Sequence, residues 1–221
     1  LQWSAPEYVP RSFLVSGVSG TNKVVEQTDT SFRLTKQVAD GLVDMQEVSK
    51  GLFLVQSEMA FKKETELCEE YPERKVFQLS FCMNGICEWD YRQKRGEHYQ
   101  LSPTQCSLQC GTFSQCVSRF GSEEPYRTLS ISLEQERFLP LAEDLEAAHL
   151  IRRDNKICTH IFSTTPEIRL VLQQLLDCPP ERKLRKLYLE GKVLELVSLF
   201  CEEAIGKRSE EHTSELQSHT S

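Results

Sequence analysis

The stretch TTPEIRLVLQQLLDCPPERKLRKLYLEGKVLELVSLFCEEAIG, residues 164–206, has the clearest pattern in the chain. Its first part predicts a helix beginning at TTPE (164–167). A threonine can cap a helix, a proline is tolerated in the first turn, and the glutamate three residues on completes a capping box. Pro179 and Pro180 end this helix, because neither can donate to a continuing one. The apolar residues of one helical face are Ile168, Val171, Leu172, Leu175 and Leu176.

The second helix of this stretch is predicted from Glu181 to Ile205, with Gly206 as a natural residue just past its end. A short proline joint between two helices favours an antiparallel hairpin. The second helix is apolar around most of its girth, which is typical of a helix buried on several sides. Packing within the chain and self-association therefore both stay open. For self-association, the heptad spacing and a glycine that allows close approach predict the interface residues Leu187, Gly191, Leu194, Val197 and Cys201.

Upstream of this stretch, the chain is rich in short strand patterns. The segment VFQLSFCM (76–83) precedes Asn84-Gly85, the strongest two-residue hairpin signal, and ICEWDY (86–91) is predicted to return beside it. LVDMQEV and LFLV, both within residues 42–55, are also predicted strands, and further short strands follow as far as residue 133.

Two regions have weaker patterns. FLVSGV (13–18) predicts an early strand, but the rest of residues 1–40 shows no clear periodicity. The charged interval 62–75 contains only scattered apolar residues. We predict a surface loop there, with a short exposed helix as the alternative.

The order of these elements predicts the fold class. Short strands separated by turn residues indicate an antiparallel sandwich or small barrel. Strands come first and helices last, unlike the alternating units of a dinucleotide-binding fold. We therefore expect an α+β fold, with an antiparallel cupin-like β-barrel or sandwich over residues 1–148 and an antiparallel helical hairpin over residues 149–207.

Charge and cysteine content narrow the function classes. The formal net charge is −7, which disfavours binding of nucleic acid phosphates by this chain. No apolar run has the length of a membrane span and no signal peptide pattern is present, so a cytoplasmic location is expected. The nine cysteines form no Cys-x-x-Cys pair, which favours reduced, buried thiols. A redox sensor using the clustered Cys106, Cys110 and Cys116 stays open.

The sequence carries no recognisable catalytic motif. It has no phosphate loop, no Gly-x-Ser-x-Gly elbow and no His-Glu-x-x-His. Because His98, His149 and His160 are isolated, we predict no catalytic residue, no metal site and no cofactor, with a metal-dependent cupin-like enzyme as the alternative. The mouth of a small barrel is a common small-molecule site, so strand aromatics are candidate ligand contacts, with ordinary core as the alternative. These candidates are Phe53, Phe81, Trp89, Tyr91 and Phe113.

Several segments together resemble the N-terminal half of an AraC-family transcriptional regulator. They are FQLSFC (77–82), WDY (89–91), PYR (125–127), ISL (131–133) and LYLEGKVLEL (187–196). The last segment is the most specific of them, and the resemblance extends over about residues 40–206. The most similar subgroup is the regulators of siderophore uptake, of the pyochelin-regulator type.

This resemblance implies how the chain works. In the family, a cupin-like sensing domain is followed by linker helices that can dimerise the protein and by a C-terminal domain that reads DNA with two helix-turn-helix units. For this chain the resemblance implies a ligand-sensing barrel for a small-molecule effector, with a siderophore as the candidate. It also implies a homodimer formed through the hairpin, and contact with DNA only through a C-terminal domain absent from this chain.

The end of the chain has a different character. RSEEHTSELQSHTS (208–221) resembles the translation of a sequencing adapter. We therefore expect it to be a non-native, disordered tail that does not pack. The chain also begins with Leu1 and not Met, and we expect it to be truncated before the helix-turn-helix domain. The last helix should then end near Gly206.

Overall fold

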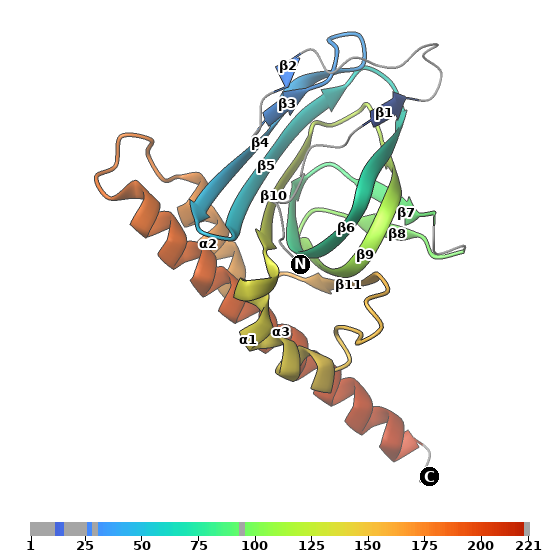
Figure 1. The fold of residues 1–221 in the computed structure, drawn as a ribbon, viewed down its shortest axis with the longest axis vertical. Helices are drawn as coiled ribbons and strands as arrows, with labels where there is room; N and C mark the ends of the chain where they lie inside the picture. The colour runs from blue at the N-terminus through green and yellow to red at the C-terminus, as the bar shows by residue number, and fades with distance from the viewer. Residues whose placement is uncertain (1–11, 16–25, 28–30, 93–95, 219–221) are drawn as a thin grey trace.

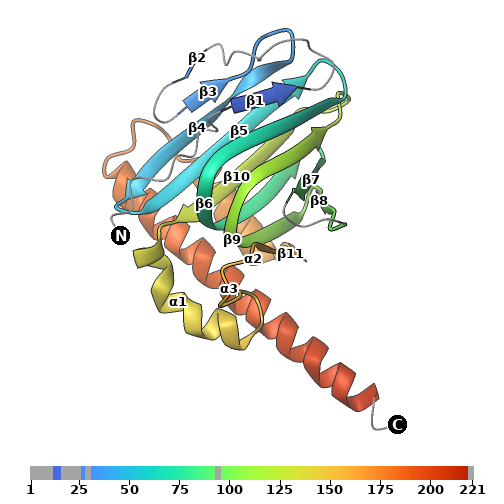
Figure 2. The same ribbon diagram turned by 45° about the vertical axis from the view of Figure 1, so that its right-hand side comes forward.

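The computed structural model of the chain describes residues 12–15, 26–27, 31–92 and 96–218. Its strands form one curled antiparallel sheet, and three helices lie together on one side of it (Figures 1 and 2). The expected α+β architecture, a cupin-like barrel or sandwich followed by helices, is confirmed. No helix in the described part of the chain is both long and apolar enough to cross a membrane.

The sheet has eleven strands among the described residues, and β9 lies between β6 and β7 in the order β2-β3-β4-β5-β10-β6-β9-β7-β8. Off this path, β1 pairs with β6 and β11 pairs with β9. The strands are β1 (Ser12–Val15), β2 (Glu26–Gln27), β3 (Ser31–Arg33), β4 (Ala39–Ser49), β5 (Leu52–Phe61), β6 (Thr65–Asn84), β7 (Cys87–Tyr91), β8 (Tyr99–Leu101), β9 (Gln105–Phe120), β10 (Tyr126–Leu133) and β11 (Cys158–Ser163). The helices are α1 (Gln135–Ala147), α2 (Pro166–Leu176) and α3 (Arg185–Ser218).

Strands β6, β9 and β10 form what we call the shared wall, because two separate cores lie on its two faces. Successive side chains of a strand point to opposite faces. On β6, Leu79 and Phe81 pack in one core with the helices, whereas Val76 and Cys82 belong to a second core inside the barrel. The helix side of the wall is apolar and consists of Phe77, Leu79, Phe81, Cys106, Leu108, Cys110, Leu129, Ile131 and Leu133.

The turn at Asn84-Gly85 is real, but the hairpin predicted around it is wrong. Gly85 has a φ of 72°, a conformation that glycine adopts readily. The Asn84 side chain donates to the Pro125 carbonyl at 2.8 Å. However, β6 pairs with β9 and β10, while β7 pairs with β8 and β9. The turn therefore connects two strands that are not neighbours in the sheet. Strand β9 lies between β6 and β7, where the hairpin would have paired them directly.

The loop predicted over residues 62–75 is also wrong, because β6 begins at Thr65 and pairs with β9. Its polar side chains reach partners on β9. Arg119 donates to Glu66 at 3.1 Å, and Gln115 donates to Glu70 at 2.7 Å. A strand whose outer face is charged has the composition of a loop, and only its pairing identifies it as a strand.

The helical hairpin is confirmed, with a corrected start. The cap of α2 is Thr165, whose hydroxyl accepts a hydrogen bond from the Ile168 amide at 3.3 Å. Thr164 does not form the expected capping box and donates instead to the Thr104 carbonyl at 2.9 Å. After the proline joint, α3 runs back along α2 (Figure 1).

Two expected boundaries shift. The β part does not end at residue 148, because β11 pairs with β9 from Cys158↔Cys110 to Ser163↔Gln105. The helix does not end near Gly206 as expected, since α3 continues to Ser218; within the tail predicted to be disordered (208–221), residues 208–218 are helical and 219–221 lie outside the described residues. A single glycine costs a helix only about 1 kcal/mol, and the residues after it are mostly good helix formers.

Candidate functional site

The barrel contains a cavity of about 200 Å³. Its walls come from strands β4 to β10, so residues distant in sequence meet around it. The lining is Val43, Met45, Val55, Ser57, Met59, Leu67, Glu69, Val76, Gln78, Ser80, Cys87, Trp89, Tyr91, Leu101, Gln109, Phe113, Cys116, Ser118, Phe120, Tyr126, Thr128 and Ser130. Well-packed protein interiors contain few voids larger than a water molecule, so a cavity of this size is a candidate binding site.

The cavity face of the shared wall is polar. Ser130 of β10 donates to the Ser80 hydroxyl of β6 at 2.9 Å, and the Gln78 amide donates to the same oxygen at 3.0 Å. On β9, Gln109 accepts a hydrogen bond from the Tyr91 hydroxyl at 2.8 Å. These bonds satisfy groups that would otherwise be costly to bury. They also keep small side chains in positions that larger apolar residues could fill, which leaves space inside the barrel.

Aromatic rings cover the β7 side of the cavity. Tyr91 lies 5.1 Å from Phe113 between ring centroids, and Trp89 stacks on Tyr99 at 5.5 Å. Burial raises the pKa of Tyr91 well above its ordinary value, so its phenol stays protonated and can donate to Gln109. The indole nitrogen of Trp89 is buried, and its nearest polar group is the Tyr91 hydroxyl.

Three of the five predicted ligand contacts line the cavity: Trp89, Tyr91 and Phe113. The other two lie elsewhere, and we do not carry them into the site. Phe81 is on the helix side of the shared wall, where its ring meets Phe200 edge-on. Phe53 is buried on β5 but lies outside the lining. Phe81 faces the helices because it alternates in step with Phe77 and Leu79, which point the same way in this part of β6.

Sequence reasoning missed the hydroxyl and amide groups of the cavity. The available signal was the alternation in TLSISL (128–133), where every second residue is polar. Such a pattern normally indicates one solvent-exposed face. In the structure, Thr128 and Ser130 are buried and line the cavity instead.

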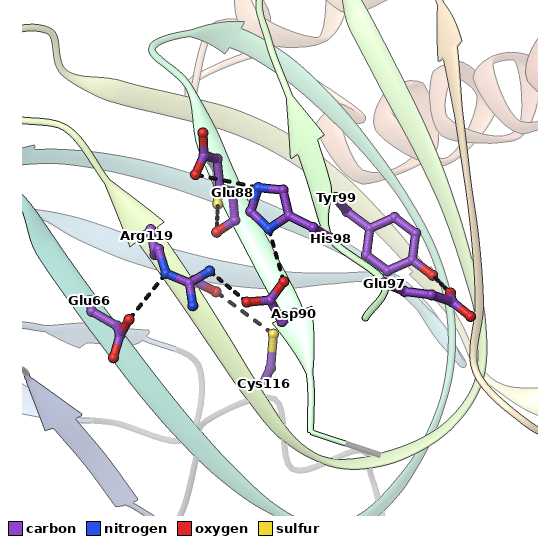
Figure 3. Close-up of polar contacts among 10 residues, drawn as sticks. Glu66, Glu88, Asp90, Glu97, His98, Tyr99, Cys116 and Arg119 are labelled. Atoms are coloured by element: carbon purple, nitrogen blue, oxygen red, sulfur yellow. Dashed lines mark hydrogen bonds and ion pairs between the residues drawn. The ribbon is translucent and has the colours of Figure 1, made fainter. Parts of the chain in front are cut away.

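The outer face of the barrel carries a charged network behind the cavity (Figure 3). His98 lies between Asp90, at 2.9 Å, and Glu88, at 3.5 Å. Asp90 also accepts from Arg119 at 2.6 Å, and Arg119 reaches Glu66 at 3.1 Å. The network joins β6, β7 and β9 with the segment before β8. It is solvent-exposed enough that we assign it a bracing role for the cavity wall and no ligand.

The cysteines are buried thiols, all nine of them. Of the predicted cluster, Cys106 and Cys110 lie in the core that faces the helices, whereas Cys116 lines the cavity. Burial raises the pKa of Cys106 to about 12 and that of Cys116 well above its ordinary value. Thiols of this kind react slowly, because the thiolate is the nucleophile. Among the described residues, no group of three or more His, Cys, Asp and Glu side chains could hold a metal ion.

The predicted dimer residues divide into two sets. Leu187 is 65% exposed, Leu194 is 43% exposed and Gly191 between them is exposed. Val197 and Cys201 are buried in the core of the chain itself, so they cannot form a surface for a partner. The reason is helical pitch. A straight helix drifts by about 20° per heptad, which carries the row that starts at Leu187 into the buried face by Cys201.

The family follows from a comparison with protein-family models. The model described as the regulatory protein PchR N-terminal domain matches residues 40–216, which is most of the chain. The chain belongs to this family. The PchR N-terminal domain is thus the unit that the barrel and the helices make up together. No curated protein sequence matches the chain.

Solved structures agree in fold. The AraC-like transcriptional activator CuxR has a TM-score of 0.52 and 8% identity, over 89% of this chain and 61% of CuxR. An apo structure of ToxT from Vibrio cholerae has a TM-score of 0.53 and 12% identity, over 74% of this chain and 59% of ToxT. The chain therefore spans about 60% of the length of these proteins.

The family match confirms the resemblance to pyochelin-regulator-type proteins, and the fold is shared with the AraC-like activator CuxR. This chain is therefore assigned to the N-terminal domain family of PchR-type regulatory proteins. Neither alternative, a metal-dependent cupin-like enzyme or a thiol-based redox sensor, is favoured by these findings.

Proposed function

We propose that this PchR-type domain binds its effector in the barrel cavity and signals through the shared wall to α3. One observation carries the proposal: consecutive residues of β6 face the cavity and the helix core. Ser80 lines the cavity, and Phe81 lies in the helix core. A strand cannot shift one of these residues without moving the other.

The contact between the wall and α3 is aromatic. The ring of Phe200 meets Phe81 at a centroid distance of 6.2 Å and an angle of 89°, and it meets Phe162 of β11 at 5.6 Å and 82°. All three rings have little freedom, because the core around them is closely packed. A ligand that draws β6 and β10 together through Ser80 and Ser130 would therefore change how α3 packs against the shared wall. To act as an effector, it must bind the two arrangements with different affinities.

The output of this domain is proposed to be a dimer. The exposed row of Leu187, Gly191 and Leu194 on α3 offers an apolar surface with a gap for close approach. Large exposed leucines on one helix face are typical of an interaction site. Association through this row would place the α3 helices of two subunits side by side. A change in the packing of α3 against the shared wall would then alter the geometry of the dimer.

The wider role of the domain follows as a proposal from its family. We propose a cytoplasmic, non-enzymatic regulator that contacts DNA through helix-turn-helix units carried outside this chain. A siderophore is the effector that the resemblance implies. Sites for drug-sized ligands have volumes of about 300–1,000 Å³, so the cavity of about 200 Å³ would hold one ring of a siderophore and not the whole molecule.

Hydrogen–deuterium exchange tests the sensing mechanism, with iron-free and ferric siderophores as probes. A binder should slow exchange in β6 and β10 and also change it in α3. Ser130→Leu, which fills the cavity from the wall, should abolish both effects. Gln56→Leu is the control, because Gln56 is exposed on β5 and the substitution places a leucine outside the barrel. Binding that survives Ser130→Leu, or that leaves α3 unchanged, would contradict the mechanism.

Sedimentation equilibrium tests the dimer. Leu187→Glu and Leu194→Glu should convert a dimer to a monomer without unfolding it, because both side chains are exposed. Leu139→Glu is the control, since Leu139 is a leucine with 55% exposure on α1. A monomeric wild-type chain, or a dimer that tolerates both substitutions, would refute this interface.

A further inference from the structure

Helix α3 is attached to the barrel at two separate places. The first is at its start, where Arg185 donates to the Gln46 side chain of β4 at 3.1 Å. The second is at Phe200, whose ring meets rings of β6 and β11. A helix rises about 1.5 Å per residue, so the two places lie about 22 Å apart along its axis. A rigid helix attached at two points tilts when one of them moves relative to the other.

A side chain of α1 strengthens the first attachment. Arg137 donates to the Lys50 carbonyl at 2.9 Å and to the Ser49 hydroxyl at 3.0 Å, both at the turn between β4 and β5. The same guanidinium lies 3.5 Å from the Glu190 carboxylate of α3. Because the donors of a guanidinium are fixed in one plane, Arg137 holds the turn and the helix in a defined relative position. Glu190 belongs to LYLEGKVLEL (187–196), the most specific segment of the family resemblance.

The turn itself has little conformational freedom. The Gly51 amide donates to the Glu47 side chain at 3.2 Å, and the Gly51 carbonyl accepts from the Glu134 amide, just before α1, at 2.9 Å. Gly51 has a φ of 71°, a conformation that most other residues avoid. A movement of β4 and β5 is therefore passed on to α1 and Arg137 and is not absorbed by the turn.

Both strands of this turn border the cavity. On β4, Met45 lines the cavity, and the next residue, Gln46, binds Arg185 of α3. On β5, Val55 and Ser57 line the cavity. Met45 and Val55 are partners in the ladder, so the two strands face the cavity side by side. A ligand that displaces these side chains would move Gln46 and the turn with them.

We infer that Arg137 is a positioning residue of the sensor, through which movement of β4 and β5 shifts the start of α3. The shared wall holds the helix at Phe200, so a shift of the turn tilts the helix about that contact. The exposed leucine row of α3 lies beside Glu190, at the end that moves. This inference rests on the proposed function, because it concerns the action of the same cavity on the same helix. It adds a polar route that does not pass through the shared wall.

Hydrogen–deuterium exchange of whole-chain variants tests this route without a ligand. Ser57→Leu adds bulk to the cavity side of β5. The readout is residues 188–194 of α3, because the backbone N–H groups of a first helical turn lack intrahelical acceptors. Ser57→Leu should change the exchange rate there by about fivefold, the effect of one net hydrogen bond. Val55→Ala, which removes bulk from the same strand, replaces Ser57→Leu if that variant does not fold.

Substitution of Arg137 should remove this response. Methionine has a chain similar in length to the arginine stem but no donor, so Arg137→Met separates the turn from α3. In this background, Ser57→Leu should no longer alter exchange in residues 188–194. If Arg137 were important for stability alone, Arg137→Met would raise exchange there but leave the response to Ser57→Leu in place.

Two controls separate this route from the shared wall and from general effects of losing an arginine. Arg152→Met is the matched control, because the Arg152 guanidinium also forms two hydrogen bonds, to Asp154 at 3.0 and 2.7 Å, but contacts neither the turn nor α3. It should leave the response to Ser57→Leu intact. Ser130→Leu acts from the shared wall, so its effect on residues 197–204 should persist in Arg137→Met.

The outcomes separate this route from the proposed function. If Ser57→Leu acts equally with and without Arg137, the role of Arg137 is refuted. If Ser57→Leu and Val55→Ala leave α3 unchanged while Ser130→Leu alters residues 197–204, the route is refuted and the proposed function survives through the shared wall. If none of the three substitutions alters exchange in α3, both fail.

Discussion

The two faces of the shared wall are both buried, yet they are built from opposite chemistry. Toward the helices, Leu79, Phe81 and Ile131 are fully buried and packed against apolar partners. Toward the barrel, Ser80 and Ser130 occupy the intervening positions and border empty space. The strands are the same, and the spacing of one residue separates the two environments. Burial alone therefore does not identify a core position in this molecule.

This difference shows that the cavity face of the shared wall is less tightly packed than the helix face. Filling the barrel with Val or Leu would gain about 25 cal/mol for each Å² of apolar surface removed from water. The serine and threonine side chains on the cavity face leave a cavity and do not contribute this hydrophobic free energy. The apolar side chains on the helix face contribute it. Locations where a protein departs from its own packing rules are expected to be functional. The contrast makes the helix face the source of stability and the cavity face the source of binding.

The largest expected effect comes from truncating the helix face. Phe81→Ala should lower the free energy of unfolding by about 3–5 kcal/mol, because it leaves a hole between β6 and Phe200. Urea denaturation followed by far-UV circular dichroism measures it. Ser80→Ala is the control on the neighbouring residue and should cost about 1–2 kcal/mol, because it removes the acceptor of the Ser130 and Gln78 hydrogen bonds. Equal losses at the two positions would break the comparison.

The coupling between wall and helix should be smaller but measurable. A double-mutant cycle with Phe81→Leu and Phe200→Leu should give a coupling energy of about 1 kcal/mol, the value of an edge-to-face aromatic pair. The same cycle between Phe81 and Phe138 serves as control, because Phe138 stacks on Phe77 and no ring contact joins it to Phe81 in the described residues. A coupling near zero for the first pair would remove Phe200 from the signalling route.

The sequence predicted the helix face better than the cavity face. Apolar residues at strand or helical spacing report burial, and most of those in FQLSFC (77–82) and in α2 are buried as expected. In TLSISL (128–133) the alternation shows that the two faces differ. It does not show whether the polar face meets water or an internal cavity, because that depends on how strands distant in sequence close the barrel. Trp89 lines the cavity as the sequence suggested, but the position of its indole nitrogen beside Tyr91 depends on the tertiary structure.

Pairing and pitch explain the other errors. Asn84-Gly85 signals a turn through local backbone preference, while the partners of β6 and β7 are set by long-range closure of the barrel. Along α3, heptad spacing predicts one stripe from Leu187 to Cys201, but heptad spacing and helical pitch differ. The fall in exposure from 65% at Leu187 to 43% at Leu194 and 6% at Cys201 follows that drift.

A single hydroxyl on the cavity face should matter less than any ring on the helix face. Ser130→Ala removes the donor to Ser80, which still receives a hydrogen bond from Gln78. The free energy of unfolding should therefore fall by only about 0.5–1 kcal/mol, measured by urea denaturation. Ser198→Ala is the control, since Ser198 is exposed on α3 and its bond to Glu202 competes with water. A loss above about 2 kcal/mol for Ser130→Ala would show that the cavity face is a structural core after all.

The smallest effect is expected on the outer face of β7, where Asp90 points away from the cavity. Burial alone would raise the pKa of Asp90, but hydrogen bonds from Arg119 and His98 outweigh it and lower the pKa below its ordinary value of 3.8. A lowered carboxyl pKa stabilises the folded state above the unfolded pKa, and this contribution is lost as the pH falls through the folded one. Arg119→Ala should therefore cost about 0.5 kcal/mol near pH 6.

The same substitution should cost less as the pH falls below about 4, because Asp90 becomes protonated with or without Arg119. Thermal unfolding of both proteins between pH 2.5 and 6, conditions chosen to span that range, measures the convergence. Arg127→Ala provides the comparison, since it removes an ion pair to Glu58 at 3.0 Å whose side chains are 52% and 63% exposed. Its cost should be smaller at pH 6. If Arg119→Ala cost more than Phe81→Ala, the charged outer face and not the helix face would hold the barrel together.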